Sequence, residues 1–305
     1  MKEEYAVETK GLCKTYGNTD AVSQLNMRVK TGAVYGLIGP NGSGKSTTLK
    51  MLCGLVRPTH GEAKLFGRNV NEPMVRRRMG VLIEEAGLHH DLTARDNVRM
   101  KAECMGLPGP KNIDSVLEIT GLANAGKKKV KHFSMGMKQR LGVALALLGN
   151  PDLLILDEPI NGLDPEGIRE LRELMNTLNE EGKTILLSSH ILGELSKIAS
   201  HYGIIREGRM IEQISREKLE EKCRDYFQLE VDNVDRALPV ISENLRDAGV
   251  EVYDNQTLRI YGFTDSAWLI QLLVTNQVQV YSSGFHHMNL EEYFLDKMEG
   301  GARNA

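Results

Sequence analysis

Cysteine is scarce in this 305-residue sequence: the four that occur, Cys13, Cys53, Cys104 and Cys223, lie far apart and form no C-x-x-C pair. This spacing favours neither a disulfide framework nor a zinc site, and it is typical of reduced cytosolic thiols. Long apolar runs are also missing, since none approaches the roughly 18 residues that span a bilayer. No apolar signal core follows residues 1–4. We therefore expect no membrane-spanning segment, and any work at a membrane would require a partner.

An excess of one charge is lacking as well. The formal net charge is −3, so the composition gives no reason to expect nucleic acid as a partner. What is present is ordinary for a globular protein, with 41% hydrophobic and 26% charged residues. This composition is sufficient for a buried core, and the length predicts about two domains.

Residues 34–52 combine three elements in the order of a phosphate-binding unit. Residues 34–38 are apolar and predict a buried strand, and residues 47–52 predict a helix. Between them lies Gly-x-x-x-x-Gly-Lys-Ser, the P-loop pattern, whose glycines allow a tight turn that aims backbone N–H groups at an anion. The helix N-terminus adds a positive dipole end. The residues expected to bind ATP here are Gly39, Pro40, Asn41, Gly42, Ser43, Gly44, Lys45, Ser46 and Thr47.

Two side chains of this loop have specific expected roles. Lys45 would reach the β- and γ-phosphates and is a predicted catalytic residue, and the Ser46 hydroxyl would hold Mg²⁺. A glycine-rich turn that matches by chance is the alternative, but the order of strand, loop and helix favours the P-loop.

Strands and helices alternate along the first 215 residues. The predicted strands are residues 5–10, 22–30, 34–38, 62–66, 79–83, 153–156, 184–187, 202–206 and 209–212. The predicted helices are residues 47–52, 94–106, 112–120, 136–149, 165–178 and 191–199, and Thr93 with Asp96 marks a helix start. This order predicts a parallel α/β sheet with an all-helical insertion at about residues 90–150.

The pattern changes after Ser215, which we take as the boundary between a domain of residues 1–215 and a domain of residues 216–305. The predicted elements beyond it are helix 215–222, strand 226–231, helix 234–247, strand 249–253, strand 257–261, helix 265–275, strand 278–282 and helix 289–298. The central order βαββαβ fits a small α+β domain of the ferredoxin-like type.

Residues 133–140, Phe-Ser-Met-Gly-Met-Lys-Gln-Arg, resemble the signature motif of ABC transporter ATP-binding subunits. That motif usually reads Leu-Ser-Gly-Gly-Gln, and Ser134 and Gly136 are kept here, whereas two methionines replace a glycine and the glutamine. With the P-loop, the resemblance covers residues 4 to about 215. It implies a P-loop NTPase cassette with a RecA-like core, an antiparallel β subdomain and a helical insertion. It also implies that Ser134 and Gly136 open a helix pointing at the γ-phosphate held by a second subunit.

Further motifs of the family follow. Residues 153–158, Leu-Leu-Ile-Leu-Asp-Glu, match the Walker B strand. The resemblance implies that Asp157 binds Mg²⁺ through water and that Glu158 is the general base for the attacking water. His190 matches the switch histidine that contacts the γ-phosphate, so Glu158 and His190 join the P-loop lysine as predicted catalytic residues. Asp164 matches the segment that crosses the dimer interface and orients the opposed site.

Two positions leave alternatives open. Tyr16 falls where the family places an aromatic ring against adenine, but a turn tyrosine covering the sheet edge is the alternative. Glu84 stands where the family usually has a glutamine that touches Mg²⁺ and the attacking water. A glutamate can still ligate Mg²⁺ but loses the N–H donors, and a neutral replacement is the alternative. Glu85 follows directly and could occupy the same position.

A glutamate at this place, the Met-rich signature and the appended C-terminal region are marks of the bacitracin- and lantibiotic-exporter branch. The resemblance therefore implies an ATPase that closes as a homodimer around Mg-ATP and drives a separate permease at the inner face of the plasma membrane. The expected cargo is a peptide antibiotic, and nucleic acid is not an expected partner. The alternatives are another cargo, such as a lipid or polysaccharide, and a soluble ABC ATPase that transports nothing. A single P-loop and the lack of a long coiled coil disfavour the last.

Overall fold

The computed structural model describes residues 4–84, 87–107, 109–223, 225–245, 248–286 and 290–299. Glu85, the alternative occupant of the position after the strand at 79–83, lies outside them. The chain divides into two compact units, Met1–Arg216 and Glu217–Ala305. Among the described residues, no helix has the length and apolar character needed to cross a bilayer.

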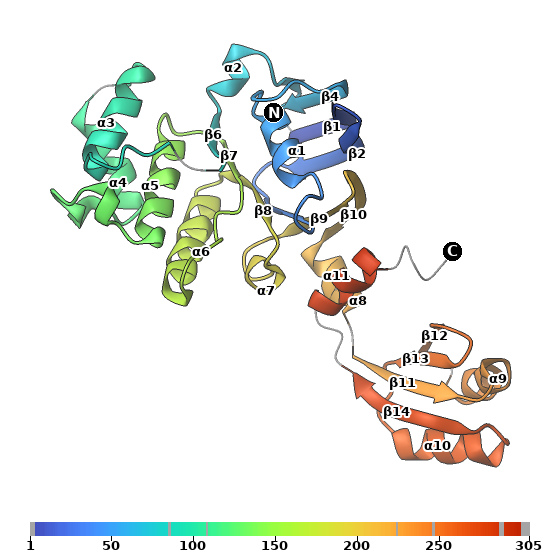
Figure 1. Cartoon of the computed structure of the whole chain (residues 1–305). Helices are drawn as coiled ribbons and strands as arrows, with labels where there is room; N and C mark the ends of the chain where they lie inside the picture. The colour runs from blue at the N-terminus through green and yellow to red at the C-terminus, as the bar shows by residue number, and fades with distance from the viewer. Residues whose placement is uncertain are drawn as a thin grey trace. The chain divides into compact units, whose positions relative to one another are not determined.

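A six-stranded sheet forms the centre of the first unit (Figure 1). Its strands, in spatial order, are β10 (Arg209–Ser215), β9 (His201–Arg206), β3 (Val34–Ile38), β8 (Thr184–Ser189), β7 (Leu153–Leu156) and β6 (Met79–Leu82). All pairs are parallel except that of β9 with the edge strand β10. Strands β3, β7 and β8 are buried along their whole length, which explains their nearly continuous apolar sequences. Because they are parallel, the residues that follow them meet at one edge of the sheet.

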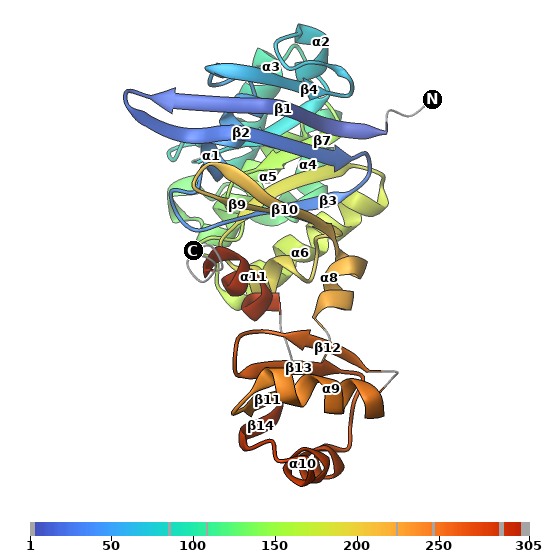
Figure 2. The same cartoon turned by 90° about the vertical axis from the view of Figure 1, so that its right-hand side faces the viewer.

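An antiparallel sheet accompanies it, with the spatial order β2-β1-β4-β5. Its strands are β1 (Tyr5–Tyr16), β2 (Thr19–Lys30), β4 (His60–Leu65) and β5 (Arg68–Asn69). The predicted strands 5–10 and 22–30 are too short, since β1 and β2 continue as one long hairpin (Figure 2). Register shifts on either side of Leu12 interrupt the alternation of buried and exposed side chains, and this hides the outer part of the hairpin from pattern analysis.

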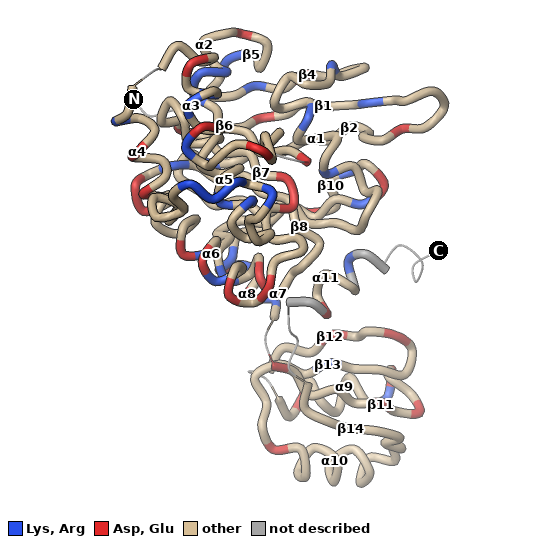
Figure 3. Tube along the Cα trace, turned by 60° about the vertical axis from the view of Figure 1, so that its left-hand side comes forward, with Lys and Arg blue, Asp and Glu red and all other residues tan. Residues whose placement is uncertain are grey.

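Three helices form the insertion and lie together in Figure 1, namely α3 (Ala94–Cys104), α4 (Pro110–Ile119) and α5 (Met135–Leu147), with 3-10 turns at Ala123–Ala125 and Val130–His132. As predicted, Thr93 begins α3, because its side chain accepts a hydrogen bond from the Asp96 N–H. Basic and acidic residues both occur along the trace of this insertion (Figure 3).

The other helices up to residue 222 are α1 (Lys45–Leu52), α2 (Pro73–Arg76), α6 (Pro165–Glu180), α7 (Leu192–Leu195) and α8 (Arg216–Lys222). The prediction of one helix over 191–199 is wrong, since only the short α7 forms. After it the chain must enter β9 beside β3, and the Ser200 N–H donates to the Val34 carbonyl at 2.8 Å. Helix α1 packs in one buried hydrophobic cluster with side chains of both sheets. The cluster contains Leu49 of α1 and Leu37 of β3. This packing fixes the loop that precedes α1.

The second unit contains β11 (Tyr226–Val231), α9 (Val234–Asn244), β12 (Gly249–Val252), β13 (Thr257–Tyr261), α10 (Ser266–Thr275), β14 (Val280–His286) and α11 (Leu290–Glu299). Its sheet has the order β12-β13-β11-β14 with antiparallel pairs throughout, which is the strand arrangement of a ferredoxin-like unit. Side chains of α9 and α10 pack on β11 and β13 in a separate core. The last strand begins later than the predicted 278–282, because Val278 belongs to this core as a loop residue.

Candidate active site

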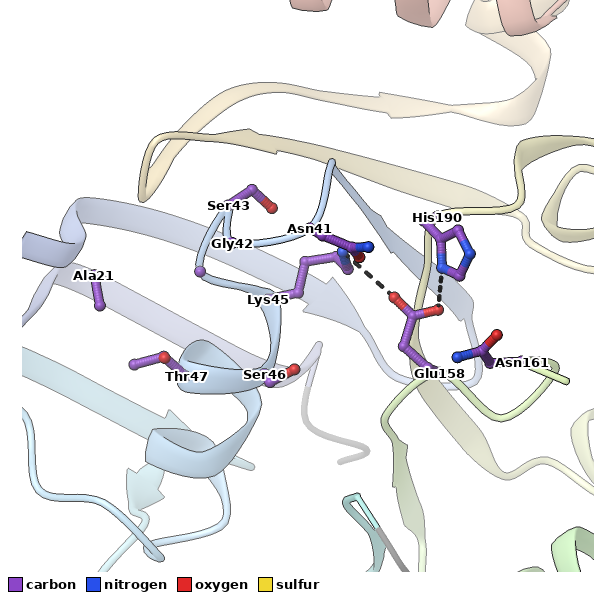
Figure 4. A pocket seen from close by; sticks show the side chains of 11 residues that line it. Ala21, Asn41, Gly42, Ser43, Lys45, Ser46, Thr47, Glu158, Asn161 and His190 are labelled. Carbon is purple, nitrogen blue, oxygen red and sulfur yellow. Dashed lines mark hydrogen bonds and ion pairs between the residues drawn. The ribbon is translucent and has the colours of Figure 1, made fainter.

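A pocket lies where β3 runs into α1, and the ends of β7 and β8 border it (Figure 4). It brings together residues from Ala21 to His190, which are far apart in the sequence. Its lining consists of Ala21, Asn41, Gly42, Ser43, Gly44, Lys45, Ser46, Thr47, Glu158, Asn161 and His190. The predicted loop residues from Asn41 to Thr47 and two predicted catalytic side chains therefore face one space.

The loop before α1 has a shape that only glycine permits at two positions. A Cβ at Gly39 would lie 2.3 Å from the Ile205 carbonyl oxygen. Gly44, the N-cap of α1, has a φ of 101°, and a Cβ there would lie 2.5 Å from the Ala21 carbonyl oxygen. With no side chain at the N-cap, the first N–H groups of α1 receive no side-chain cap. They are left to bind an anion in the pocket.

Lys45 is the cation of this pocket. Its side chain is only 5% exposed, and its Nζ donates to the carbonyls of Gly39 at 2.7 Å and Pro40 at 3.2 Å. Beside it, the buried Ser43 Oγ makes no hydrogen bond within the described chain. A buried cation, a hydroxyl without a partner in the described chain and a helix N-terminus are groups that can bind phosphate, so the residues present fit a nucleotide.

Glu158 and His190 meet at the mouth of the loop (Figure 4). The Glu158 Oε1 lies 3.4 Å from the Lys45 Nζ, and its Oε2 lies 2.8 Å from the His190 Nδ1. Glu158 follows β7 with a φ of 47°, the left-handed region that few non-glycine residues adopt. This turn directs the carboxylate towards the pocket, between a cation and an imidazole.

Asp157 lies one residue earlier and is buried. Its Oδ1 accepts a hydrogen bond of 2.6 Å from the Ser188 hydroxyl of β8. Burial raises the pKa of the nearby Cys53 thiol to about 12, and the Asp157 charge adds to the rise, so this thiol stays neutral. The described residues contain no group of three His, Cys, Asp or Glu side chains that could hold a metal by themselves. Any Mg²⁺ would need other oxygen donors, such as hydroxyl and phosphate groups.

Glu84 does not line this pocket in the part of the chain that the structure describes. Its side chain is 67% exposed, and its Oε1 lies 2.5 Å from the Nζ of Lys50 on α1. The hydrogen bond to Glu84 raises the pKa of Lys50, so this pair favours the protonated lysine. The pair links the segment after β6 to the helix that carries the P-loop lysine.

Ser134, Gly136 and Asp164 also do not line this pocket. Ser134 caps α5 by accepting a hydrogen bond from the Met137 N–H, and Asp164 caps α6 by accepting one from the Gly167 N–H. The starts of these two helices are adjacent, because a Cβ at Gly136 would lie 3.7 Å from the Gly167 Cα. Two helix N-termini are thus presented side by side on this unit.

Tyr16 is 49% exposed at the end of the long hairpin, and the Lys14 Nζ lies 5.0 Å from the centre of its ring. Tyr16 does not line the pocket.

Ala21 and Asn161 do line the pocket, although sequence reasoning did not select them as site residues. Asn161 could have been found from its place three residues after Glu158, in the turn where its N–H donates to the Glu158 carbonyl. Ala21 lies on β2 and carries no chemical signal in the sequence.

A parallel sheet with a glycine loop, a buried lysine and a facing carboxylate defines a P-loop ATPase. The family model described as ABC transporter matches residues 22–161. The bacitracin transport ATP-binding protein BcrA of Bacillus licheniformis is 41% identical over 97% of this chain and 98% of its own length. The lantibiotic transport ATP-binding protein SrtF of Streptococcus pyogenes is 45% identical over 67% of this chain and 89% of its own.

A solved dimer of an ATP-binding cassette, in a post-hydrolysis state bound to ADP and Pi, is 26% identical with a TM-score of 0.62, over 69% of this chain and 98% of that one. This chain belongs to the ATP-binding proteins of the ABC transporter family. It is therefore a nucleotide-binding, ATP-hydrolysing subunit of an ABC transporter, and such subunits work with membrane permeases.

Proposed function

We propose that Glu158 is the general base of ATP hydrolysis in this chain, with Lys45 and His190 as its catalytic neighbours. The observation that carries this proposal is the position of the Glu158 carboxylate, between the Lys45 Nζ and the His190 Nδ1 at the mouth of the P-loop. A carboxylate here can take the proton of the attacking water. Lys45 offsets the charge of the phosphates, and His190 can donate to the γ-phosphate.

The proposed cofactor is Mg²⁺, which would neutralise phosphate charge when bound. Ser46 and Asp157 are the residues proposed to hold it, the aspartate through water. Both offer the hard oxygen donors that Mg²⁺ prefers, and the Asp157 carboxylate is already oriented by the Ser188 hydroxyl. Glu84 is a third proposed ligand only if it leaves Lys50.

The proposed active form is a homodimer that closes on ATP. Ser134, Gly136 and Asp164 do not line the chain's own pocket, yet they begin two adjacent helices. Helix N-termini favour anions, so these residues are suited to the nucleotide of a second copy. The similar cassette that was solved as a dimer supports this assignment.

The proposed cargo is a peptide antibiotic of the bacitracin or lantibiotic type, exported by a separate permease with this chain at the inner face of the plasma membrane. The support is the similarity to BcrA over nearly the whole of both chains and to SrtF over the cassette. Co-expression with its cognate permease in a bacitracin-sensitive host tests the proposal. We expect resistance to rise. Unchanged sensitivity to bacitracin and to lantibiotics would favour another cargo, such as a lipid.

Glu84→Gln is expected to bind ATP at least as tightly as wild type and to hydrolyse it at a comparable rate without the permease, but to confer less resistance. The carboxylate lies outside the pocket and is bound by Lys50, so its charge acts on the hinge between the ATPase core and the helical insertion. ATPase and resistance assays on the same variant are the measurement.

Lys50→Gln, which breaks the same ion pair from the other side, is the matched control for Glu84→Gln. Loss of resistance in both variants would assign the coupling to the pair, and loss only in Glu84→Gln would assign it to the carboxylate. Unchanged resistance would remove the coupling role of Glu84. A large fall in basal hydrolysis would instead make it part of the catalytic machinery.

Tyr16→Ala is expected to weaken ATP binding by about 5- to 150-fold, because a base stacked on an aromatic ring gains about 1–3 kcal/mol. Tyr16→Phe keeps the ring and is expected to bind like wild type. A fluorescent ATP analogue measures both affinities. Equal binding by all three proteins would show that Tyr16 only covers the end of the hairpin.

A further inference from the structure

Ser188 lies on β8 directly beside the end of β7, and its side chain is fully buried. Its hydroxyl makes two hydrogen bonds to the two acidic residues that follow β7. The Oγ accepts from the Glu158 N–H at 2.8 Å, and it donates to the Asp157 Oδ1 at 2.6 Å. One buried oxygen therefore contacts both acidic residues of the proposed mechanism, Asp157 and Glu158.

We infer that Ser188 is a positioning residue for hydrolysis, which holds Asp157 and Glu158 in their working orientations through this single hydroxyl. The inference rests on the proposed roles of those two residues. It goes beyond them because Ser188 itself does not line the pocket and is not placed to touch the nucleotide.

The backbone explains why Glu158 needs this support. Its φ of 47° is uncommon for a residue with a side chain and persists only where the surroundings hold it. On the side of the strand, the Glu158 N–H donates to the Ser188 hydroxyl. On the side of the following turn, the Glu158 carbonyl accepts from the Asn161 N–H, so both ends of the residue are held. With the turn held, the carboxylate reaches Lys45 and His190.

The chemistry of the bridge requires a hydroxyl. Ser188 must accept from an N–H and donate to a carboxylate at the same time, and a hydroxyl has both the proton and the lone pairs. Asp157 is buried, so its carboxylate needs a donor from the protein to keep its orientation towards a bound metal. Alanine has neither function, whereas threonine keeps both.

The test compares Ser188→Ala with Thr184→Val. Thr184 lies on the same strand and is also fully buried, and its Oγ1 accepts a hydrogen bond from the Gly32 N–H at 2.9 Å. Its substitution removes a buried hydroxyl of β8 without touching either acid. We expect Ser188→Ala to lower kcat by about 10- to 100-fold while the KM for ATP changes by less than about threefold.

Two further readouts separate positioning from general stability. In Ser188→Ala, the Mg²⁺ concentration that half-saturates binding of a fluorescent ATP analogue should rise by about 10-fold or more. Ser188→Thr should restore kcat and the Mg²⁺ requirement. Thr184→Val should lower the Tm but leave kcat and the Mg²⁺ requirement near wild type.

Wild-type kcat in Ser188→Ala would overturn the inference, as would equal losses in Ser188→Ala and Thr184→Val. If Ser188→Ala does not fold, Ser188→Cys takes its place, because the thiol fills a similar volume but is a weak donor; it should show the same loss of kcat. Absence of ATP hydrolysis in the wild-type chain would count against the proposed function, not against the role of Ser188.

Discussion

Lys45→Ala is expected to abolish ATP hydrolysis and to remove most of the ATP binding. Lys45 is the cation that lines the loop pocket in the described structure, and its Nζ is held by two loop carbonyls, 3.4 Å from the Glu158 carboxylate. Its removal takes away the lysine cation that would offset the phosphate charges and leaves Glu158 without this partner. Phosphate release and the affinity for a fluorescent ATP analogue are the measurements.

Lys183→Ala is the matched control for Lys45→Ala. Lys183 is also held by neighbouring oxygens, since its Nζ donates to Asn150 Oδ1 at 2.6 Å and to the Pro151 carbonyl at 3.2 Å, but it does not line the pocket. The Lys183→Ala variant should hydrolyse ATP at the wild-type rate. Wild-type turnover in a purified Lys45→Ala protein would falsify the P-loop assignment.

Glu158→Gln is expected to lower hydrolysis by about 10²- to 10⁴-fold while ATP still binds, because the amide keeps the shape of the side chain and cannot act as a base. The nucleotide then persists, so the variant should accumulate as a dimer with Mg-ATP. The wild-type chain should be mainly monomeric without nucleotide. Size exclusion with light scattering, beside phosphate release on the same sample, measures both effects.

Glu62→Gln controls for the loss of one negative charge. Glu62 lies on β4, beside Lys64 at 3.3 Å and outside the pocket, so its variant should resemble wild type in rate and mass. A Glu158→Gln protein that stays monomeric at every ATP concentration would argue against the closed dimer for the isolated subunit. A variant with wild-type turnover would transfer the role of base to another group.

The parallel core could be predicted because its strands carry their burial in the sequence. Strands β3, β7 and β8 are buried on both faces, so each appears as an apolar run with a polar segment at its end. The same reasoning places Lys45, Glu158 and His190 at one edge of the sheet. It fails for the outer part of the β1–β2 hairpin, where register shifts break the alternation, and for the expected helix at 191–199.

The sequence by itself determined the order of the elements, the phosphate-binding loop and the acidic and histidine residues at the strand ends, because each depends on neighbours within a few positions. The tertiary structure alone decided which partners these residues have. It pairs Glu84 with Lys50, joins both acids to Ser188, and adds Ala21 and Asn161 to the pocket. The physical reason is that hydrogen bonds and ion pairs depend on distances of a few ångströms. Between segments far apart in the chain, the register and packing of the sheet set those distances.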